Sequence, residues 1–573
     1  MADSNILEAK KCKILEILRL FHIHTASIVV RRLAGQSEHK TFSLQKLERA
    51  TSDEQNSLEY EVSSRADISF PIASITKVLV AIAFTMATLD TSPNKESRHN
   101  GFKDRNLENA VLTTTYNRYK KDPSMPGLRD LPGNPTISHV LSHWGMPSSN
   151  HRLFAPDGSA QMSADDVVQY IYELNNSDIN KDGESSGWNQ YSNLNYVLVG
   201  MAIEALWGGT LSDFIDNTLL KPLGIGNSTT TGYQENPDVL QSDRYIVDSQ
   251  GTLHSTDAPN YVSSGVEAAA MGCYSCIGDL DKIFTNVLER FASPDSDDNF
   301  RTSLSRLRAR HTENPEYTRL GLFSPGLDSR EIGSMSTNRL MFPKQNFTKY
   351  RAAPRSKERI ETYYHAGSAI GCSCAYALLP HEDAAKAFFV VVLTNTSGPV
   401  DASDHILRLI LREIYFIRSS GGTFAKVKLK LDGSKNLPKL YKKAWRASSK
   451  MFKRHEEEDS AVGLDISTDI SGVYKLKDST QRLEVKSING VPHITFHGNG
   501  GSSRQLRLAW LSSSVVRICV PQGGKPHISI DRLGDADWAN LEFQVEMNNS
   551  AVEALVRKTH LEVVDRFERE QSQ

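Results

Sequence analysis

The sequence predicts a mixed α/β chain, in which an antiparallel sheet flanked by helices precedes a small all-β domain. Three stretches indicate this class. An apolar run, Val78 to Phe84, forms two turns of a predicted helix. Two apolar strands, Cys372 to Leu379 and Ala387 to Thr394, are joined by a turn and form a predicted hairpin. From about Ile466, short alternating strands are separated by Asn-Gly and Gly-rich turns, which is typical of a barrel or a sandwich.

Other elements of the first domain are predicted in chain order. Ile6 to Phe21 has the pattern of an amphipathic helix rich in lysine and arginine, and Thr25 to Leu33 that of a strand. Ser57 to Ile68 is a polar approach to the apolar helix. Asp401 to Phe416 has apolar residues at helical spacing, which predicts a terminal helix that covers one face of the sheet.

Changes in composition divide the chain into three predicted regions. Residues 1–420 form one domain, 421–465 a charged connector, and 466–573 the small β domain. The connector is first basic and then acidic, which favours a solvated linker over a phosphate- or membrane-binding arm because the charges offset each other. Residues 90–135 are rich in Asn, Lys, Asp and Pro, which predicts a long insertion. It could form a lid over the functional site or a solvent-exposed loop.

The overall composition argues against several classes of partner. The 573 residues carry a formal net charge of −2, so there is no electrostatic reason to expect nucleic acid or an acidic membrane as a partner. No apolar run approaches the roughly 20 residues of a membrane span. Residues 1–30 show no secretory signal, and we therefore expect a cytoplasmic protein.

Two of the cysteine spacings permit a metal site. Cys273 and Cys276 form one close pair, and Cys372 and Cys374 another. Cys372 and Cys374 alternate on a strand and so share a face, which suits packing as well as it suits zinc. Free thiols are the usual state inside the cell. We expect packing thiols, with no metal and no other cofactor.

A serine and a lysine lie one helical turn apart at the start of the apolar helix. Ser74 and Lys77 are three residues apart and therefore share a helix face. An amine partly shielded from water loses proton affinity and can accept the serine proton, and the helix N-terminus favours a developing alkoxide. Two further Ser-x-x-Lys runs, Ser37 to Lys40 and Ser43 to Lys46, have no apolar helix behind them. The context predicts that Ser74 is a nucleophile and Lys77 its base.

Two later stretches carry polar groups suited to the same chemistry. Tyr191 and Asn193 lie on a loop that leads into a second apolar helix; a phenol can relay a proton, and an amide can donate to a carbonyl. His365, Gly367 and Ser368 precede the apolar hairpin, and a glycine there lets a substrate backbone approach closely. Taken singly, the tyrosine and the histidine have the pattern of packing and surface residues. The three motifs in order favour catalysis.

Together the motifs resemble those of the serine β-lactamase and penicillin-binding-protein superfamily, on its class C and D-aminopeptidase/esterase side. Ser74 to Lys77 resembles its Ser-x-x-Lys motif and Tyr191 to Asn193 its Tyr-x-Asn motif. His365 to Gly367 lies where lactamases carry Lys-Thr-Gly. Between them, Thr136 to Pro147 resembles the family loop LLSHTSGLP, and Lys221 to Ile225 resembles its PLGM turn.

The resemblance spans residues 20–418 and implies a fold and a set of roles. The fold is β-lactamase-like, with an all-helical subdomain beside the antiparallel sheet. The C-terminal region is similar in pattern to the lipocalin-like barrels appended to some relatives, where such a domain can gate the site. The implied site residues are Ser74, Lys77 and Tyr191 for catalysis, and Asn193, His365, Gly367 and Ser368 for substrate binding.

The roles follow position by position from the resemblance. Ser74 is the residue to be acylated, and Lys77 and Tyr191 share the general-base and general-acid work. Asn193 orients a substrate carbonyl or amide, and the backbone N–H groups of Ser74 and Ser368 form the oxyanion hole. Histidine in place of the lactamase lysine is mostly neutral at pH 7, which argues against a grip on a substrate carboxylate and against β-lactam hydrolysis as the main activity.

We therefore expect a serine hydrolase that acts through an acyl-enzyme on an ester, amide or thioester of a small molecule. One alternative is an acyltransferase or transesterase that moves an acyl chain onto a natural product. Another is a catalytically silent binding protein that has kept the β-lactamase fold. The motifs do not distinguish water from a bound acceptor in the second step, and they do not give the oligomeric state.

Overall fold

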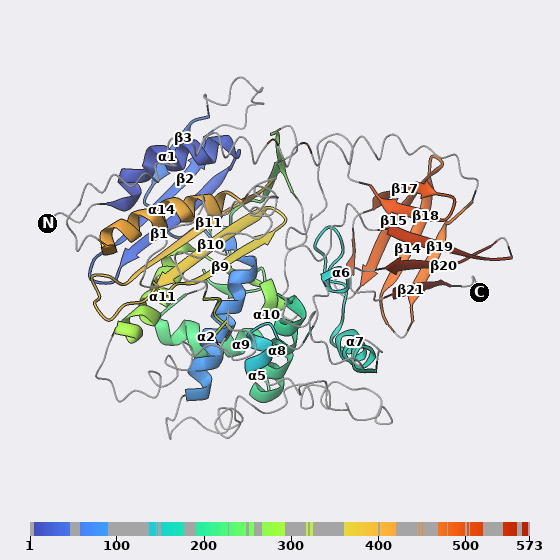
Figure 1. Ribbon diagram of the computed structural model, residues 1–573, viewed down its shortest axis with the longest axis horizontal. Coiled ribbons are helices and arrows are strands. Elements are labelled where there is room, and N and C mark those ends of the chain that lie inside the picture. Colours follow the sequence, from blue (N-terminus) through green and yellow to red (C-terminus); the bar gives the residue numbers. More distant parts are fainter. Residues whose placement is uncertain are drawn as a thin grey trace.

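The computed structural model contains a mixed α/β region and a separate all-β region (Figure 1). The residues that it describes are 5–45, 58–89, 137–144, 146, 150–176, 191–226, 228–247, 251–256, 266–292, 317–318, 321–324, 360–398, 401–419, 446, 450, 468–477, 479–498, 501–503, 505–519, 542–549, 551–558 and 564–570. The predicted insertion lies outside them, and so does the predicted connector apart from two residues. The insertion, the connector and the domain limits stay predictions.

A six-stranded antiparallel sheet forms the centre of the first domain. Its strands lie in the order β3-β2-β1-β11-β10-β9. Their bounds are β1 Thr25–Arg32, β2 Ser37–Leu44, β3 Tyr60–Ser63, β9 Tyr363–Ala369, β10 Cys372–Leu379 and β11 Phe388–Thr394. Strand β1 pairs with β11, so the two ends of this domain meet in the middle of the sheet.

Helices cover the sheet and form a region beside it. Their bounds are α1 Ile6–Leu20, α2 Thr76–Leu89, α5 Ile137–Leu141, α6 Asn150–Leu153, α7 Ala164–Asn176, α8 Asn193–Trp207, α9 Leu211–Ile215, α10 Ala268–Met271, α11 Ile277–Ala292 and α14 Ala402–Ser419. Helices α2, α5, α8, α9 and α10 gather below β9 in the view of Figure 1. Helix α8 is capped by Gly208, whose φ of 73° is a left-handed conformation that glycine readily adopts.

The apolar helices raise the question of a membrane span. No single helix among the described residues is long and apolar enough to cross a bilayer. One sharply bent pair, Asn193–Trp207 with Leu211–Leu223, passes the same test by length and composition. Most side chains of α8 are buried within the protein core, which accounts for their apolar character.

The side chains of the central strands point alternately to the two faces of the sheet, and both faces are buried. In β11, Val390 and Val392 belong to one hydrophobic cluster, and Phe389 and Val391 belong to the other. Helices α1 and α14 pack together over the first face, and α11 packs against β1 and β11 on the second. This burial on both faces explains why β10 and β11 are continuous apolar runs in the sequence.

Most predicted elements of the first domain are confirmed, but two strands of the central sheet, β2 and β3, and the short strands of the two small sheets were not predicted. The N-terminal helix, the first strand, the apolar hairpin and the terminal helix are all present. The polar approach Ser57 to Ile68 contains edge strand β3, and β2 beside it was not predicted. Both strands carry charged and polar side chains that are only partly buried, and so lack a clear apolar alternation. His365 to Ser368 lies within a third strand, β9, rather than before a pair.

Short strands complete the first domain. One small sheet joins β4, β8 and β5, and another joins β12, β6 and β7. Their bounds are β4 Phe70–Pro71, β5 Thr230–Thr231, β6 Tyr245–Val247, β7 Leu253–Ser255, β8 Cys273–Ser275 and β12 Thr396–Ser397. Strand β4 leads directly into the turn that carries Ser74, so its pairing with β8 fixes the entry to that turn.

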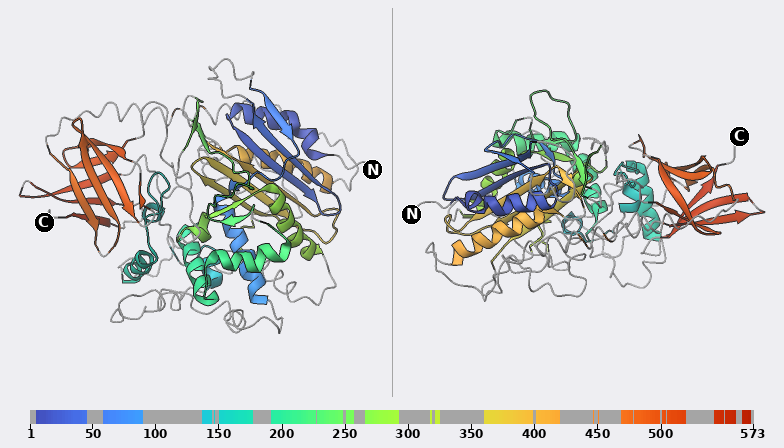
Figure 2. Two further views of the ribbon diagram at one scale, coloured as in Figure 1. Left: turned by 180° about the vertical axis from the view of Figure 1, so that it is seen from behind. Right: turned by 90° about the horizontal axis from the view of Figure 1, so that it is seen from above.

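The C-terminal strands close into an antiparallel barrel (Figure 2). Their bounds are β13 Gly472–Leu476, β14 Arg482–Ile488, β15 Val491–Gly498, β16 Gly501–Ser502, β17 Leu506–Ser512, β18 Val515–Ile518, β19 Glu542–Asn548, β20 Ala551–Lys558 and β21 Val564–Arg569. Each strand pairs with its neighbours in chain order, β13 pairs with β21, and the short β16 is appended to β15. The barrel is therefore of the up-and-down type. The predicted fold class is confirmed, with a barrel rather than a sandwich.

Candidate active site

Ser74 lies in a single 3₁₀ turn, Ala73–Ile75, between β4 and α2. Ala73 has a φ of 42°, in the left-handed region that a residue with a side chain rarely enters. Ser74 itself is only 4% exposed. Strained backbone of this kind persists where the surrounding structure holds it, often at functional sites. The strand, the strained turn and the helix together hold the serine hydroxyl in one place.

Lys77 is buried in the first turn of α2, and its amine has three polar contacts. Nζ lies 3.1 Å from Ser74 Oγ, 2.7 Å from Asn193 Oδ1 and 2.5 Å from the carbonyl oxygen of Ala270. Burial lowers the pKa of Lys77 well below its ordinary value of 10.5. A neutral amine has two N–H groups for the two carbonyl oxygens, which leaves its lone pair for the Ser74 hydroxyl. The contact set suits a base.

Tyr191 contacts the serine from the segment that precedes α8. Its hydroxyl is 2.6 Å from Ser74 Oγ and 3.5 Å from Asn193 Oδ1. Tyr191 stands just outside α8, and Asn193 is the first residue of that helix. The Tyr-x-Asn spacing therefore directs one side chain to Ser74 and the other to Lys77. The structure brings together all three residues for which the sequence predicts acid–base and nucleophilic roles.

Strand β9 runs directly against the turn that holds Ser74. A methyl group on Gly367 would lie 2.7 Å from the carbonyl oxygen of Ile72, 3.1 Å from the backbone nitrogen of Ser74 and 2.6 Å from Cys374 Sγ. The first and last of these distances are shorter than real Cβ contacts allow, so any side chain here would force β9 and its neighbours to move. The close approach brings β9 next to the Ser74 turn, while the pairing of the Ser74 and Ser368 N–H groups as an oxyanion hole stays a prediction.

His365 lies on β9 beside Tyr191, and the two ring centroids are 5.6 Å apart. Its Nδ1 is 2.6 Å from the carbonyl oxygen of Ala366. Burial lowers the pKa of His365 to about 4, and the neighbouring Lys77 amine acts in the same direction whenever it is protonated. The ring is therefore neutral at pH 7, and β9 offers no cation at the position where lactamases carry lysine.

His143 belongs to the same cluster, although no role for it was predicted. It follows α5 with a φ of 58° and is 1% exposed. Its ring lies 4.4 Å from that of Tyr191, and its Nδ1 is 3.1 Å from both the backbone N and O of Ser192. Burial lowers the pKa of His143 well below 6.5. Its place in the loop Thr136 to Pro147 was the signal that could have found it.

Replacing His143 is expected to reduce turnover through Tyr191. We expect His143→Asn to lower kcat about 10-fold with little change in KM, because small misplacements of a catalytic group are costly. Asparagine tolerates the left-handed backbone, so this variant removes the ring without adding strain. Steady-state kinetics, with His139→Asn in the preceding helix α5 as the control, would measure the effect. An unchanged kcat in the folded variant would contradict this positioning role.

The cysteines form no metal centre in the described part of the chain. No group of three or more His, Cys, Asp or Glu side chains there could hold a metal ion. All six thiols are free, and five of them are buried. Burial raises the pKa of Cys273, Cys276 and Cys372 to about 11, so these thiols stay protonated. Cys374 donates to the carbonyl oxygen of Ile72 at 3.0 Å, under the Ser74 turn.

Comparison with known proteins identifies the family. The Beta-lactamase family profile matches residues 54–413. The fold is similar to the octameric penicillin-binding protein homologue from Pyrococcus abyssi, with 16% identity, a TM-score of 0.47 and coverage of 98% of this chain and 99% of that one. A β-lactamase from Sulfitobacter sp. EE-36 is 16% identical, with a TM-score of 0.49 over 72% of this chain and 99% of that one. A class C β-lactamase from Rhodobacter sphaeroides is 17% identical, with a TM-score of 0.47 over 72% and 100%.

No curated protein matches the chain. The family profile nevertheless covers more than half of the 573 residues. The matched region includes the serine–lysine turn, the tyrosine–asparagine pair and the histidine–glycine strand that meet around Ser74. The chain belongs to the Beta-lactamase family.

Proposed function

We propose that this chain is a serine hydrolase, in which Ser74 forms an acyl-enzyme with an ester, amide or thioester of a small molecule. One observation carries the proposal: Ser74 Oγ lies 2.6 Å from the Tyr191 hydroxyl and 3.1 Å from Lys77 Nζ. A buried amine can accept the serine proton, and a phenol can pass a proton to the leaving group. The Ser74 hydroxyl thus contacts one group that can take its proton and another that can protonate the leaving group.

The proposed reaction has two steps. Neutral Lys77 takes the Ser74 proton as Oγ attacks the substrate carbonyl carbon, and the N–H groups of Ser74 and Ser368 hold the resulting oxyanion. The bond to the leaving group then breaks, and Tyr191 delivers the proton to that group. In the second step water attacks the acyl carbon and gives a proton to the Tyr191 phenolate. The bond to Ser74 Oγ then breaks, Oγ takes back its proton from Lys77, and the acid is released.

The electrostatics of the site support an uncharged acyl group. His365 is neutral at pH 7 because its pKa is about 4. Lys77 is already engaged by Ser74, Asn193 and Ala270, and its pKa is well below the ordinary value. Neither residue supplies a fixed positive charge for a substrate carboxylate. We therefore infer that esters, thioesters or amides without a carboxylate next to the scissile bond are better donors than β-lactams.

Intact-protein mass after brief exposure to activated acyl donors tests the proposal. The panel contains neutral esters, thioesters, D-amino-acid amides and a β-lactam, and Ser74→Ala serves as the matched control. An acyl mass increment on the wild type alone supports the proposal and identifies the donor class. No adduct and no turnover with any donor would favour the catalytically silent alternative.

The fate of the acyl group distinguishes a hydrolase from an acyltransferase. Once a donor is known, the decay of the adduct is followed in water and then with added alcohols and amines. Decay that does not depend on the acceptor supports the hydrolase. An adduct that persists in water and disappears only with an acceptor would instead support acyl transfer onto a second small molecule.

A further inference from the structure

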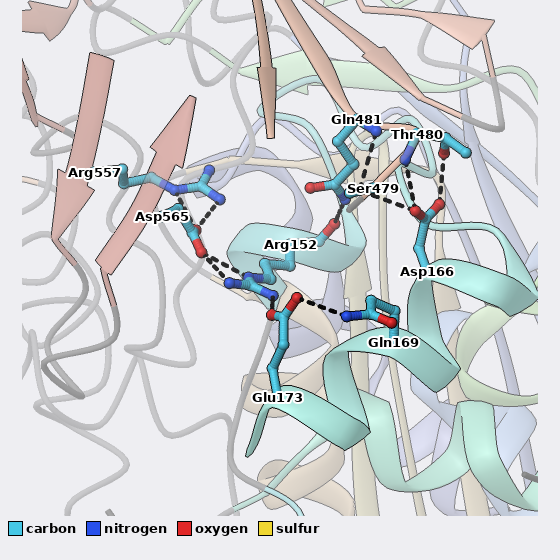
Figure 3. A network of polar contacts seen from close by, with 9 residues as sticks. All are labelled: Arg152, Asp166, Gln169, Glu173, Ser479, Thr480, Gln481, Arg557 and Asp565. Carbon is cyan, nitrogen blue, oxygen red and sulfur yellow. Dashed lines mark hydrogen bonds and ion pairs between the residues drawn. The ribbon is translucent and has the colours of Figure 1, made fainter. Parts of the chain in front are cut away.

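A buried polar network joins the barrel to the first domain (Figure 3). Arg152 of α6 donates from Nε to Asp565 of β21 at 2.7 Å, and Arg557 of β20 pairs with the same carboxylate. Asp565 is 0% exposed, Arg557 1% and Arg152 6%. Arg152 also donates to Glu173 of α7 at 3.1 Å. Two arginines and two carboxylates therefore balance each other, although Glu173 is 39% exposed. Removing Asp565 would leave two buried arginines without this carboxylate.

A second set of contacts lies beside the first. Asp166 of α7 accepts from the backbone N–H of Thr480 at 2.7 Å, from Thr480 Oγ1 at 2.5 Å and from Ser479 Oγ at 2.9 Å, all in the turn between β13 and β14. Gln481 Nε2 donates to the carbonyl oxygen of Arg152 at 2.7 Å. Although burial acts in the opposite direction, the hydrogen bonds from Thr480 and Ser163 hold the pKa of Asp166 below 3.8. The barrel is thus held at two points on α6 and α7.

Between these two helices, residues 153–161 form a small hairpin that we call the connecting hairpin. Its two arms are tied by backbone bonds from Ala155 N to Ser159 O and from Gln161 N to Leu153 O, both 2.8 Å. One side of it packs on the barrel, because Ala155 belongs to the barrel's hydrophobic cluster. A methyl group on Gly498 of β15 would lie 2.5 Å from Gln161 Cα. Barrel and hairpin are therefore in direct backbone contact.

The tip of the connecting hairpin reaches the strand that forms the proposed oxyanion hole. Gly158, with a φ of 86°, lies at the tip, where a Cβ would be 3.7 Å from Ile370 Cδ1. Ile370 is buried in the turn between β9 and β10, two residues after Ser368. The hairpin thus touches the barrel at Gln161, and its tip at Gly158 lies next to Ile370 at the end of β9.

We propose that the barrel positions the acyl-binding strand from outside the active site. Held by Arg152 and Asp166, it supports the connecting hairpin, which in turn fixes the β9–β10 turn and the distance between Ser368 and Ser74. The inference rests on the proposed function, because acyl transfer makes that distance matter. Arg152, Asp166 and Gly498 are positioning residues in this scheme. They act through packed backbone, and close-packed interiors transmit small displacements.

The sharpest test places a methyl wedge between the barrel and the connecting hairpin. Gly498→Ala forces the hairpin backbone to move, since the new carbon would lie 2.6 Å from the carbonyl oxygen of Gln161, and it changes no charge. We expect the acylation rate constant of Ser74 to fall about 10-fold, because displacements of this size have large catalytic effects. Gly226→Ala is the matched control, because a methyl group there meets no atom within 4 Å.

A second variant, Arg152→Met, opens the charged contact instead, with the exposed barrel arginine Arg482→Met as its control. Hydrogen exchange of residues 363–372 is measured in all four full-length variants. We expect faster exchange in this segment for Gly498→Ala and Arg152→Met only, and a loss in kcat rather than in KM. Unchanged exchange in both variants would overturn the proposal, whether or not the wild type is acylated.

The two readouts separate the two proposals. No adduct on the wild type would refute the acyl-enzyme, and the exchange data would still decide whether the barrel holds β9. An adduct that forms at the wild-type rate in both folded variants would refute the positioning role and leave the acyl-enzyme standing.

Discussion

Replacing Lys77 by methionine is expected to lower the acylation rate of Ser74 by about 10³-fold, within the range for loss of a general base. The only amine contacting Ser74 Oγ among the described residues would be lost, while the side chain would stay apolar and of similar length. Stopped-flow measurement with the donor identified by mass would give the rate. Circular dichroism would establish that the variant folds.

The role of Lys77 as a base also predicts the direction in which the acylation rate changes with pH. Only the neutral amine has a lone pair for the serine proton, so wild-type acylation should rise with pH and level off above the apparent pKa of Lys77. Burial places that pKa well below 10.5. Because neighbouring groups titrate together, the midpoint belongs to the coupled cluster and not to one residue. In Lys77→Met the rising limb due to this amine should disappear.

An arginine at the same position separates a base from a fixed charge. Arginine stays protonated in proteins, so Lys77→Arg keeps the positive charge and cannot take the serine proton. If Lys77 is the base, the arginine and methionine variants should be similarly slow. A folded Lys77→Arg variant with more than a tenth of wild-type activity would contradict the role of base and favour simple electrostatic stabilisation.

The local part of the site could be predicted from sequence because it depends on spacing within single elements. Ser74 and Lys77 share a helix face at a separation of three, and the structure keeps them within 3.1 Å. Tyr191 and Asn193 straddle the start of one helix in the same way. Such spacing is fixed within one element and does not depend on contacts with distant segments.

The remainder of the site depends on contacts between distant segments. The carbonyl oxygen of Ala270 that engages Lys77 carries no side-chain signal in the sequence, and neither does the contact of His143 with Ser192. Polar strands such as β2 and its edge neighbour β3 lack the apolar alternation that identifies a strand. The barrel strands alternate in the same way that sandwich strands do, and only the pairing of β13 with β21 closes the ring.

The pairing of Arg152 with Asp565 was likewise beyond sequence reasoning. The two residues are 413 positions apart, and each is an ordinary charged residue in its own segment. Charged side chains are normally solvated, so a buried pair across two domains can be recognised only after both have folded. A function that depends on such long-range contacts, as we propose for the barrel, leaves no short motif in the sequence.

Replacing Gly367 by alanine is expected to lower the acylation rate by about 10²–10³-fold, the usual cost of losing an oxyanion-hole donor. The added methyl would lie 2.7 Å from the Ile72 carbonyl oxygen and 3.1 Å from the Ser74 nitrogen, so β9 and the Ser74 turn must separate. Their two N–H groups would then no longer converge on one oxygen. Single-turnover kinetics would measure the loss, with Gly35→Ala as a control whose nearest contact is 3.6 Å.

A second substitution shows which contact causes the loss. The Gly367 methyl would also lie 2.6 Å from Cys374 Sγ, and Cys374→Ala removes that atom. If crowding by the sulfur were responsible, the double variant would recover activity. We expect little recovery, because the clash with the Ile72 backbone remains, and because the two changes act on one contact their effects should not simply add. Full recovery would mean that β9 tolerates a side chain at position 367. It would also mean that catalysis does not require the short distance between β9 and the Ser74 turn.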